Sequence, residues 1–564
     1  MKIVRKQVIQ PGNVFLFLFI QLVFLNILNK SIQAKVPSKS KDTPMLTIVI
    51  VIDQFAFHYI PKLQKYFKYG LKDLFDNGIV YYKAYHPHGV PETTPGHHGL
   101  SIGTCPRDHG AVANDWLDPN GKIVEYVSDP AYPSLTSNEQ ATGYSSRNTK
   151  VDGLSDQFMF KSKPNCIHKV YALSLKSYPA VSMAGKLGKP FWIDQQSGEF
   201  TSSTAYFKEL PKWVTDFNQL GQAEKLKNTV WKLMYPEDAD EYDFAFMKNY
   251  DYAGMNEPMV GANSDKVISK INLHKYYMFE KTPQSSKYLL NFAEKCIDSN
   301  LKINSNDKMI LWVSLSNLDL LCHFYGPDSL ETIDLIYHID KQLKDFFMYL
   351  KKKIGEKNYL LVLTADHGIC PIPEIAQKQG FYQAKRIAAK TLIEHINEIV
   401  REKFDLPDFE VYFEPTSFVI KHEVFDKLSV KIKQEILKTI KDYLRSVPGI
   451  KNVWTFEELE GATFQPHQLE SFYKNQLYAG RSGDIICQPE PYCQITKYPT
   501  GTSHMTPYDY DTHVPLIIYQ RGRFEKKKIN KKVWIPQLPA TLARILHVEQ
   551  PSASIYDLLP GLSF

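Results

Sequence analysis

Four apolar runs rich in β-branched residues, each bordered by acidic residues or histidine, constrain the fold of this chain most. LTIVIVIDQF (Leu46–Phe55) is uninterrupted up to Asp53. KMILWVSLSNLD (Lys308–Asp319) and NYLLVLTADHG (Asn358–Gly368) repeat this design, and HVPLIIY (His513–Tyr519) is the fourth run. Continuous apolar runs, without alternation of polar residues, are typical of strands buried on both faces, as in a parallel sheet.

A helical segment lies between the second and third runs. SLETIDLIYHIDKQLKDFFMYLKKKIG (Ser329–Gly355) has apolar residues at helical spacing and ends at a glycine. Strand, helix and strand in succession predict a right-handed crossover and an α/β fold, with a mainly parallel central sheet flanked by helices on both faces. We expect the long stretches of about 119–300 and 371–500 to supply flanking strands and cap regions inserted over the site.

The first 34 residues have the features of a signal peptide. A basic start precedes the apolar run Val14–Leu28, and Ala34 stands where a signal peptidase could cut. The run is shorter than the roughly 20 apolar residues that span a bilayer, and an uncleaved N-terminal anchor is the alternative. We expect a periplasmic or secreted protein without stable membrane insertion after cleavage. Residues 35–45 would form a linker, and residues 46–564 the catalytic domain.

The charge balance gives no support to nucleic-acid binding. The whole chain has a formal net charge of +6, from 67 basic and 61 acidic residues. The predicted signal peptide holds four of the basic residues and no acidic one, so 63 remain against 61, and the net charge falls to +2. Nucleic-acid-binding domains carry a clearer basic excess.

Seven cysteines are present, and none falls in a CxxC zinc pattern. Cys487 and Cys493 are near enough in sequence to close a short loop as a disulfide in an oxidising compartment. The odd number leaves at least one thiol unpaired, and the connectivity stays open.

Aspartates and histidines beside the predicted strands form a candidate metal site. Ligands of α/β folds bind beyond the carboxyl ends of the strands. The residues in question are Asp53, Asp319, His323, Asp366, His367 and His513. Taken singly, an aspartate or histidine at such a position is most often a turn former, a helix cap or a surface residue. Their joint occurrence indicates Zn²⁺, which takes three or four such ligands, and six groups with one hydroxyl would hold two ions roughly 4 Å apart.

The segment PETTPGHHG (Pro91–Gly99) contains a second chemical signal. It places two threonines beside a Pro-Gly turn and two histidines. A hydroxyl next to an imidazole indicates either a nucleophile with its base or a metal site. The residues alone do not choose between these readings.

In this order, the motifs VIDQF, TTPGHH, AND, D-x-x-x-H-x-x-GP, TADHG and THVPL resemble those of the alkaline phosphatase superfamily. Within it, the chain is most similar to secreted alkaline phosphatases with a threonine nucleophile, near relatives of the nucleotide pyrophosphatases and phosphodiesterases. The resemblance covers about residues 46–520. It implies an alkaline-phosphatase-like fold and two zinc ions that serve the hydrolysis of phosphate esters.

Matched residue by residue, the resemblance implies two sets of zinc ligands. One ion would be held by Asp319, His323 and His513. The other would be held by Asp53, Asp366, His367 and the nucleophile Thr93. The implied reaction forms a phospho-threonine, which water then hydrolyses. The remaining histidines receive lesser roles: His97 supports the turn, His98 packs or lies at the surface, and His504 is a candidate for lining the site.

Three further residues would contact the substrate. The resemblance assigns Asn114, in ANDW, to a phosphoryl oxygen. Monoesterases of this type carry a Lys-x-Arg pair, in which Lys176 matches the lysine while Tyr178 stands in place of the arginine. A monoester dianion has one more anionic oxygen to bind than a diester. Lys176 therefore favours a monoesterase, whereas Tyr178 brings no charge and no bidentate donor.

The expected function is that of a zinc-dependent alkaline phosphatase of broad specificity that acts on small phosphate esters. A phosphodiesterase or nucleotide pyrophosphatase of the same superfamily is the main alternative, and a non-catalytic binding protein on the same fold is a remote one. A sulfatase does not fit, because TCPRD (Thr104–Asp108) has cysteine directly before proline and is offset from the nucleophile position. The oligomeric state and the physiological substrate stay open.

Overall fold

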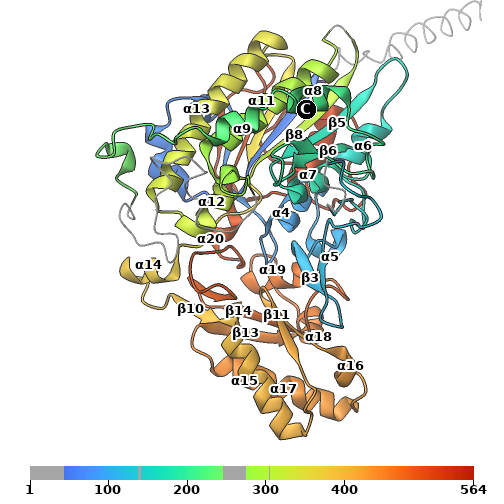
Figure 1. Cartoon of the computed structure of the whole chain (residues 1–564), viewed down its shortest axis with the longest axis vertical. Coiled ribbons are helices and arrows are strands. Elements are labelled where there is room, and N and C mark those ends of the chain that lie inside the picture. The colour runs from blue at the N-terminus through green and yellow to red at the C-terminus, as the bar shows by residue number, and fades with distance from the viewer. Residues whose placement is uncertain (1–42, 137–141, 246–274, 304) are drawn as a thin grey trace, which may run out of the picture. The chain divides into compact units, whose positions relative to one another are not determined.

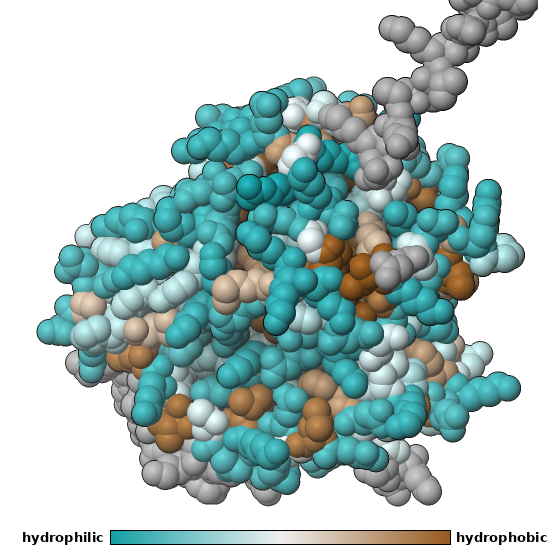
Figure 2. Space-filling view, turned by 90° about the horizontal axis from the view of Figure 1, so that it is seen from above, coloured by the Kyte–Doolittle hydropathy of each residue, from teal (hydrophilic) through white to brown (hydrophobic). Residues whose placement is uncertain are grey.

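The structure is a computed structural model that describes residues 43–136, 142–245, 275–303 and 305–564. The predicted signal peptide and residues 35–42 of the predicted linker lie outside the described residues. Within those ranges, no helix is long and apolar enough to cross a membrane. On the face shown in Figure 2, hydrophilic side chains predominate and apolar ones form small separate groups.

Parallel strands form the centre of a ten-stranded sheet in the unit Pro44–Phe564. β1 (Leu46–Ile52) lies between β8 (Lys308–Leu315) and β9 (Tyr359–Thr364), parallel to both. All residues of β1 and β9 are buried, which explains why their sequences are continuously apolar. β5 (His168–Ser174) and β6 (Lys189–Ile193) continue the parallel order beyond β8. The three runs assigned to central strands are therefore confirmed.

The fourth predicted strand, β16 (His513–Tyr519), runs in the opposite direction. It is antiparallel both to β9 and to β2 (Ile79–Tyr85). Short strands complete the edges: β7 (Phe200–Thr201) on one side, β17 (Lys527–Ile529) and β18 (Val533–Trp534) on the other. The order is β17-β2-β16-β9-β1-β8-β5-β6-β7, with β18 paired to β2, so the sheet is mainly parallel, as predicted.

Helices flank the sheet in two groups of mutually contacting elements (Figure 1). One group consists of α3 (Gly70–Asn77), α11 (Pro283–Asn300), α12 (Asn317–Tyr325) and α13 (Leu330–Lys353). The other consists of α4 (Thr93–Ile102), α6 (Leu154–Phe160), α7 (Ser177–Ala184) and α21 (Gln537–Leu546). The predicted crossover helix is α13; the Ser329 side chain caps its first turn by accepting a hydrogen bond from Thr332 N at 3.2 Å.

A smaller antiparallel sheet lies within the second long stretch. Its order is β11-β12-β14-β13, which are Val411–Glu414, Ser417–Ile420, Ile485–Pro489 and Ile450–Thr455. Two helices cover it with buried residues at i, i+4 and i+8: α15 (Ala389–Phe404) and α17 (Val430–Ser446). These residues share a buried cluster with the strands, separate from the core of the main sheet.

All seven cysteines are free, so the Cys487–Cys493 disulfide is not formed. Cys487 is buried in β14, where it belongs to the core of the smaller sheet. Cys493 begins β15 (Cys493–Thr496), and its Sγ lies 3.1 Å from the Gln383 carbonyl oxygen. Proximity in sequence does not bring the two thiols together, because they face different neighbours.

Candidate active site

Three adjacent parallel strands deliver acidic and imidazole side chains to one edge of the main sheet. Asp53 follows β1, and Asp366 and His367 follow β9. β8 leads into α12, which carries Asp319 and, one turn later, His323. Since β9, β1 and β8 are neighbours, their carboxyl ends lie side by side, as the sequence argument requires.

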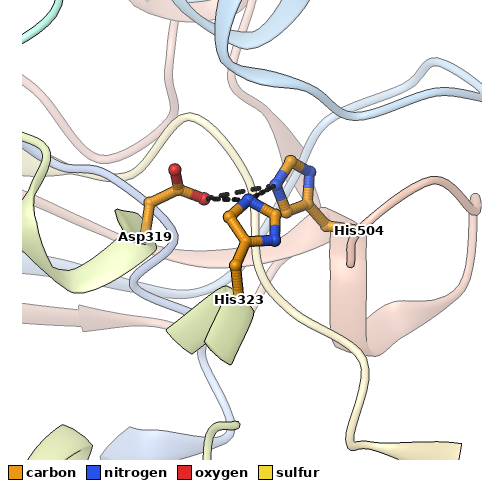
Figure 3. Close-up of side chains that lie close together, drawn as sticks. All are labelled: Asp319, His323 and His504. Carbon is orange, nitrogen blue, oxygen red and sulfur yellow. Dashed lines mark hydrogen bonds and ion pairs between the residues drawn. The ribbon is translucent and has the colours of Figure 1, made fainter. Parts of the chain in front are cut away.

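Asp319 is shared by two groups of potential ligand atoms. Its Oδ1 lies 3.2 Å from Nε2 of His323 and 3.2 Å from Nε2 of His504 (Figure 3). These three residues offer ligand atoms that all lie within 4.8 Å of one another. Asp53, Asp319 and His367 form a second group that meets the same limit.

His513 does not lie in either group; His504 stands in the first group at the place that the sequence predicted for His513. The ring of His513 is stacked between those of Phe57 and Tyr85, with centroid distances of 4.1 and 4.2 Å. Its Nε2 is 2.9 Å from the Tyr82 carbonyl oxygen. His513 begins the antiparallel strand β16, where its ring packs between neighbouring aromatic side chains.

His504 comes from the loop before α20 (Asp509–Thr512), a segment without helix or strand periodicity. Apolar periodicity therefore gave no signal for it. The loop passes against α12: Gly501 has a φ of +72°, and a Cβ there would be 2.2 Å from the His323 carbonyl oxygen. Glycine at this position permits the close approach that brings His504 to the site.

The three clustered histidines share one hydrogen-bonding pattern. Each has Nδ1 near a backbone carbonyl oxygen: His367 at 3.0 Å from Gly368, His323 at 2.9 Å from Thr502, and His504 at 2.8 Å from Pro91. A proton on each Nδ1 leaves the Nε2 lone pair directed into the site, which is the usual arrangement of metal-bound imidazoles. Burial, followed by the charge of His504, lowers the pKa of His367 and so favours its neutral, ligating form.

Buried oxygen and nitrogen atoms without hydrogen-bond partners converge at the same place. Nε2 of His367 is 3.5 Å from Asp53 Oδ1 and 3.3 Å from Asp366 Oδ2. None of these three atoms forms a hydrogen bond within the described part of the chain. Buried polar atoms of this kind require a partner. Carboxylate oxygens and imidazole nitrogens are donors that suit Zn²⁺, so the residues fit a cation site.

The carboxylates repel one another in this buried setting. Burial, followed by the charge of Asp366, raises the pKa of Asp53. Burial and the charge of Asp319 raise the pKa of Asp366 to about 7. Asp319 differs: burial acts to raise its pKa, but the charges of Lys176 and His323 outweigh it and hold the pKa well below the ordinary value. The positive charge of Lys176 thus favours the ionised form of these carboxylates.

Lys176 is the lysine that contacts the cluster directly. Its Nζ lies 3.1 Å from Asp53 Oδ2 and also donates to Asp319 Oδ2. Burial acts to lower the pKa of Lys176, but the charges of Asp319 and Asp53 outweigh it and raise the pKa above its ordinary value. Lys176 stands directly before α7, after β5, so a further strand end contributes to this edge of the sheet.

Thr93 is the first residue of α4 and is 3% exposed. Its carbonyl oxygen is 2.8 Å from Nδ1 of His97, and that nitrogen is 3.1 Å from Asp366 Oδ2. At Gly96, a Cβ would be 2.2 Å from the Asp366 carbonyl oxygen, so the first turn of the helix packs directly on the segment that carries Asp366. The candidate nucleophile thus begins a helix anchored against the candidate ligands.

The two histidines after the Pro-Gly turn have structural partners. His97 bonds Ser314 through Nε2 at 2.9 Å, in addition to its contact with Thr93. His98 is fully buried, with Nε2 at 3.1 Å from Thr149 Oγ1. With both ring nitrogens partnered, these residues support the helix, and His98 is not a surface residue.

Asn114 lies against the start of α4. Its Oδ1 accepts hydrogen bonds from Thr94 N at 2.9 Å and from Thr94 Oγ1 at 2.7 Å. Its backbone N–H donates to Glu92 Oε2 at 2.8 Å. These contacts hold the amide beside Thr93 and make Nδ2 its remaining donor.

Tyr178, in the first turn of α7, is engaged elsewhere. Its hydroxyl donates to Glu125 Oε1 at 2.5 Å, and burial together with the charge of Glu125 raises the pKa of Tyr178. The ring packs against a cluster that includes Trp192. In this structure, the hydroxyl proton is given to Glu125.

Comparisons with known proteins identify the family and the fold of this chain. A family model described as type I phosphodiesterase / nucleotide pyrophosphatase matches residues 47–514. The alkaline phosphatase PhoV of Synechococcus elongatus is 30% identical over 549 residues, which cover 94% of this chain and 96% of the relative. The alkaline phosphatase PafA of Elizabethkingia meningoseptica is 28% identical over 532 residues, covering 91% and 93%. A crystal structure of wild-type alkaline phosphatase PafA has the same fold, with a TM-score of 0.82 and 24% identity over 92% of this chain and 98% of that one.

Proposed function

The chain belongs to the type I phosphodiesterase / nucleotide pyrophosphatase family and is a phosphoric ester hydrolase, and from this premise we propose that it is a zinc-dependent phosphomonoesterase that acts through a phospho-threonine. The observation that carries the proposal is the convergence of three carboxylates and three Nε2 atoms beside the first turn of α4. Two relatives named alkaline phosphatase, similar over nearly their whole length, support the monoesterase reading.

We assign the candidate ligands to two proposed ions. Asp319, His323 and His504 would hold one zinc ion. Asp53, Asp366, His367 and Thr93 would hold the other. When bound, the two ions would lower the pKa of the threonine hydroxyl and stabilise the leaving oxygen.

Side chains of this protein would attack the phosphorus, bind the phosphoryl oxygens and position the nucleophile. Thr93 Oγ1 attacks phosphorus as the ester oxygen leaves with the bonding electrons, and water then cleaves the Thr93–phosphate bond to release inorganic phosphate. Lys176 supplies positive charge to the phosphoryl oxygens, and Asn114 donates a hydrogen bond to one of them. His97 holds the first turn of α4, so that the nucleophile keeps its position.

The experiment compares hydrolysis of an aryl phosphate and a bis-aryl phosphate by the wild type, Thr93→Ala and Thr93→Ser. We expect the wild type to prefer the aryl phosphate and Thr93→Ala to lose at least about 10³-fold in kcat/KM, since it lacks the nucleophile. Thr93→Ser keeps a hydroxyl and is the matched control. Full activity of Thr93→Ala would rule out the mechanism, and less than one zinc per purified chain would favour a binding protein instead.

A phosphodiesterase is the second candidate, and Tyr178 is the observation that favours it. The residue carries no charge, and its hydroxyl is bonded to Glu125. A diester has one anionic oxygen fewer to satisfy, so it would not need the missing arginine. A strong preference of the wild type for the bis-aryl phosphate would select this candidate.

A further inference from the structure

Gln54 directly follows Asp53 in the turn at the end of β1, and 0% of its surface is exposed. Phe55 N donates to the Ile52 carbonyl oxygen at 3.0 Å, which closes a four-residue turn with Gln54 in the third place. Gln54 has a φ of +69°, in the left-handed region where glycine is the usual residue. Strained backbone of this kind is concentrated at functional sites, so the presence of glutamine here requires a reason.

Gln54 contacts a carboxylate from each of the two proposed ligand sets. Its backbone N–H donates to Asp366 Oδ1 at 3.1 Å, and its side-chain Nε2 donates to Asp319 Oδ1 at 2.8 Å. The two aspartates come from different parts of the fold, one after β9 and the other in α12. Hydrogen bonds to ionised carboxylates are stronger than those between neutral groups, so both contacts restrain the carboxylates that they reach.

The hydrogen bond to Asp366 determines which carboxylate oxygen faces the site. Oδ1 of Asp366 accepts from Gln54 N and from His367 N, each at 3.1 Å. Oδ2 forms no hydrogen bond within the described residues and lies 3.3 Å from His367 Nε2. Two backbone donors thus hold one oxygen in place and leave the other available to a cation.

The hydrogen bond to Asp319 acts on the oxygen that faces the histidines of the first group. Asp319 Oδ1 lies 3.2 Å from Nε2 of His323 and 3.2 Å from Nε2 of His504, while Oδ2 accepts from Lys176. A carboxylate oxygen has two lone pairs, so the Gln54 amide can occupy one and leave the other directed toward the imidazoles. Groups that donate to a ligating carboxylate orient it and thereby affect metal affinity.

The same glutamine contributes little to stability. Its Oε1 is buried and has no hydrogen-bond partner within the described part of the chain. A buried amide with one unsatisfied atom costs free energy, and so does the left-handed backbone. The contacts of Gln54 with the two carboxylates are therefore the benefit that this residue brings to the turn.

We propose that Gln54 is a positioning residue, whose side-chain amide turns Asp319 Oδ1 toward the ion of the first ligand set. The proposal rests on the proposed zinc-dependent function and adds to it a determinant of zinc affinity. The backbone N–H of Gln54 orients Asp366 whatever the side chain is. A change of the side chain alone therefore weakens the binding of one ion and spares the other.

The test replaces Gln54 by Met and by Gly in the zinc-loaded protein. Met keeps the length of the side chain and removes the amide, whereas Gly removes the whole side chain and relieves the left-handed backbone. For both variants we expect one zinc ion to bind about tenfold to a hundredfold more weakly and the other to stay within about threefold of the wild type. Competition with a chelator measures both affinities.

Two controls accompany these variants. Asp405→Gly is the matched backbone control, because Asp405 is exposed, has a φ of +53° and follows the last residue of α15. We expect this variant to keep the affinity for both ions. In a His504→Ala background, where the first ligand set has already lost a donor, Gln54→Met is expected to cause no further loss of zinc.

A role of Gln54 in packing alone predicts a different outcome. Met would then fill the space of glutamine and keep both zinc affinities within about twofold of the wild type, while Gly would lose them. That result, or an equal loss of both ions in a folded Gln54→Met variant, overturns the proposal. Failure of the proposed function is recognised separately, by a wild type that binds two zinc ions and hydrolyses neither ester, whereas the chelator competition reports on Gln54 without turnover.

Discussion

At the scale of single residues, the hydrogen bonds of the histidine rings distinguish candidate metal ligands from histidines that support the structure. His323, His367 and His504 each use Nδ1 on a backbone carbonyl and keep Nε2 for the site. His97 has partners at both nitrogens, and Nε2 of His513 is turned to the Tyr82 carbonyl. The identity of the ligands thus depends on the atom that each ring leaves available.

Replacement of His504 or His513 distinguishes the two assignments. His504→Ala is expected to lower the zinc content from about two to about one per chain and to reduce kcat/KM by at least about 10²-fold, because one ligand set loses a donor. His513→Phe keeps a flat ring between Phe57 and Tyr85 and is expected to retain both ions. Elemental analysis of the purified variants provides the measurement. Loss of zinc from His513→Phe with full zinc in His504→Ala would restore the original assignment.

At the scale of elements, the smaller sheet region is connected to the segment before the nucleophile. α19 (Leu469–Gln476) ends with a buried glutamine whose Oε1 accepts from Val90 N at 3.2 Å and whose Nε2 donates to the Val112 carbonyl. Val90 lies shortly before Thr93, and Val112 shortly before Asn114. The side-chain amide of Gln476 therefore links the segment before Thr93 to the segment before Asn114.

The variant Gln476→Ala tests this connection. Loss of both hydrogen bonds lets the two segments move relative to each other, and we expect kcat/KM for an aryl phosphate to fall by about tenfold or more. Zinc content is expected to stay unchanged, since the ligands lie elsewhere. The control is Ser471→Ala on the same helix, where the hydroxyl bonds the Gln468 carbonyl at 2.6 Å. Equal activity of Gln476→Ala and the control would contradict the role of the amide.

At the scale of the whole molecule, neutral histidines whose ring nitrogens are buried make stability depend on pH. Burial lowers the pKa of His58 to about 3, of His86 to about 4, and of His98 to about 3. In the unfolded chain these groups titrate near pH 6.5, so the unfolded state binds more protons between about pH 3 and 6.5. The free energy of unfolding therefore falls as the pH drops through this window.

His58→Phe is expected to reduce the loss of stability in acid. A histidine with a folded pKa of about 3 accounts for about 2 kcal/mol of destabilisation between pH 7 and pH 5, and phenylalanine removes this contribution. Urea denaturation at the two pH values measures the difference. The exposed His395, replaced in the same way, serves as the control. An identical pH dependence in His58→Phe and the wild type would show that His58 is not buried in its neutral form.

The pattern of apolar residues predicts most of the fold but only part of the candidate site. Continuous apolar runs predict β1, β8 and β9 and the candidate ligands that follow them. Burial on both faces requires apolar side chains at successive positions, and the sequence shows this directly. The direction of β16 could not be predicted from this pattern, because an antiparallel strand between two neighbouring strands is equally apolar. His504 lies outside any strand. Its position depends on the close packing of its loop against α12, and strand and helix periodicity do not record such a contact.

The candidate ligands are spread along the chain from Asp53 to His504, and this affects the order in which the site is assembled. During synthesis, Asp53, Asp366 and His367 emerge long before the loop that holds His504. A nascent chain can complete the group Asp53, Asp319 and His367 early, whereas His323 must wait for His504, which lies just before β16. Under the proposed function, full loading with metal is therefore a late event, which follows synthesis of most of the chain. A chain truncated before residue 504 would keep the central strands and still lack the group that His504 completes.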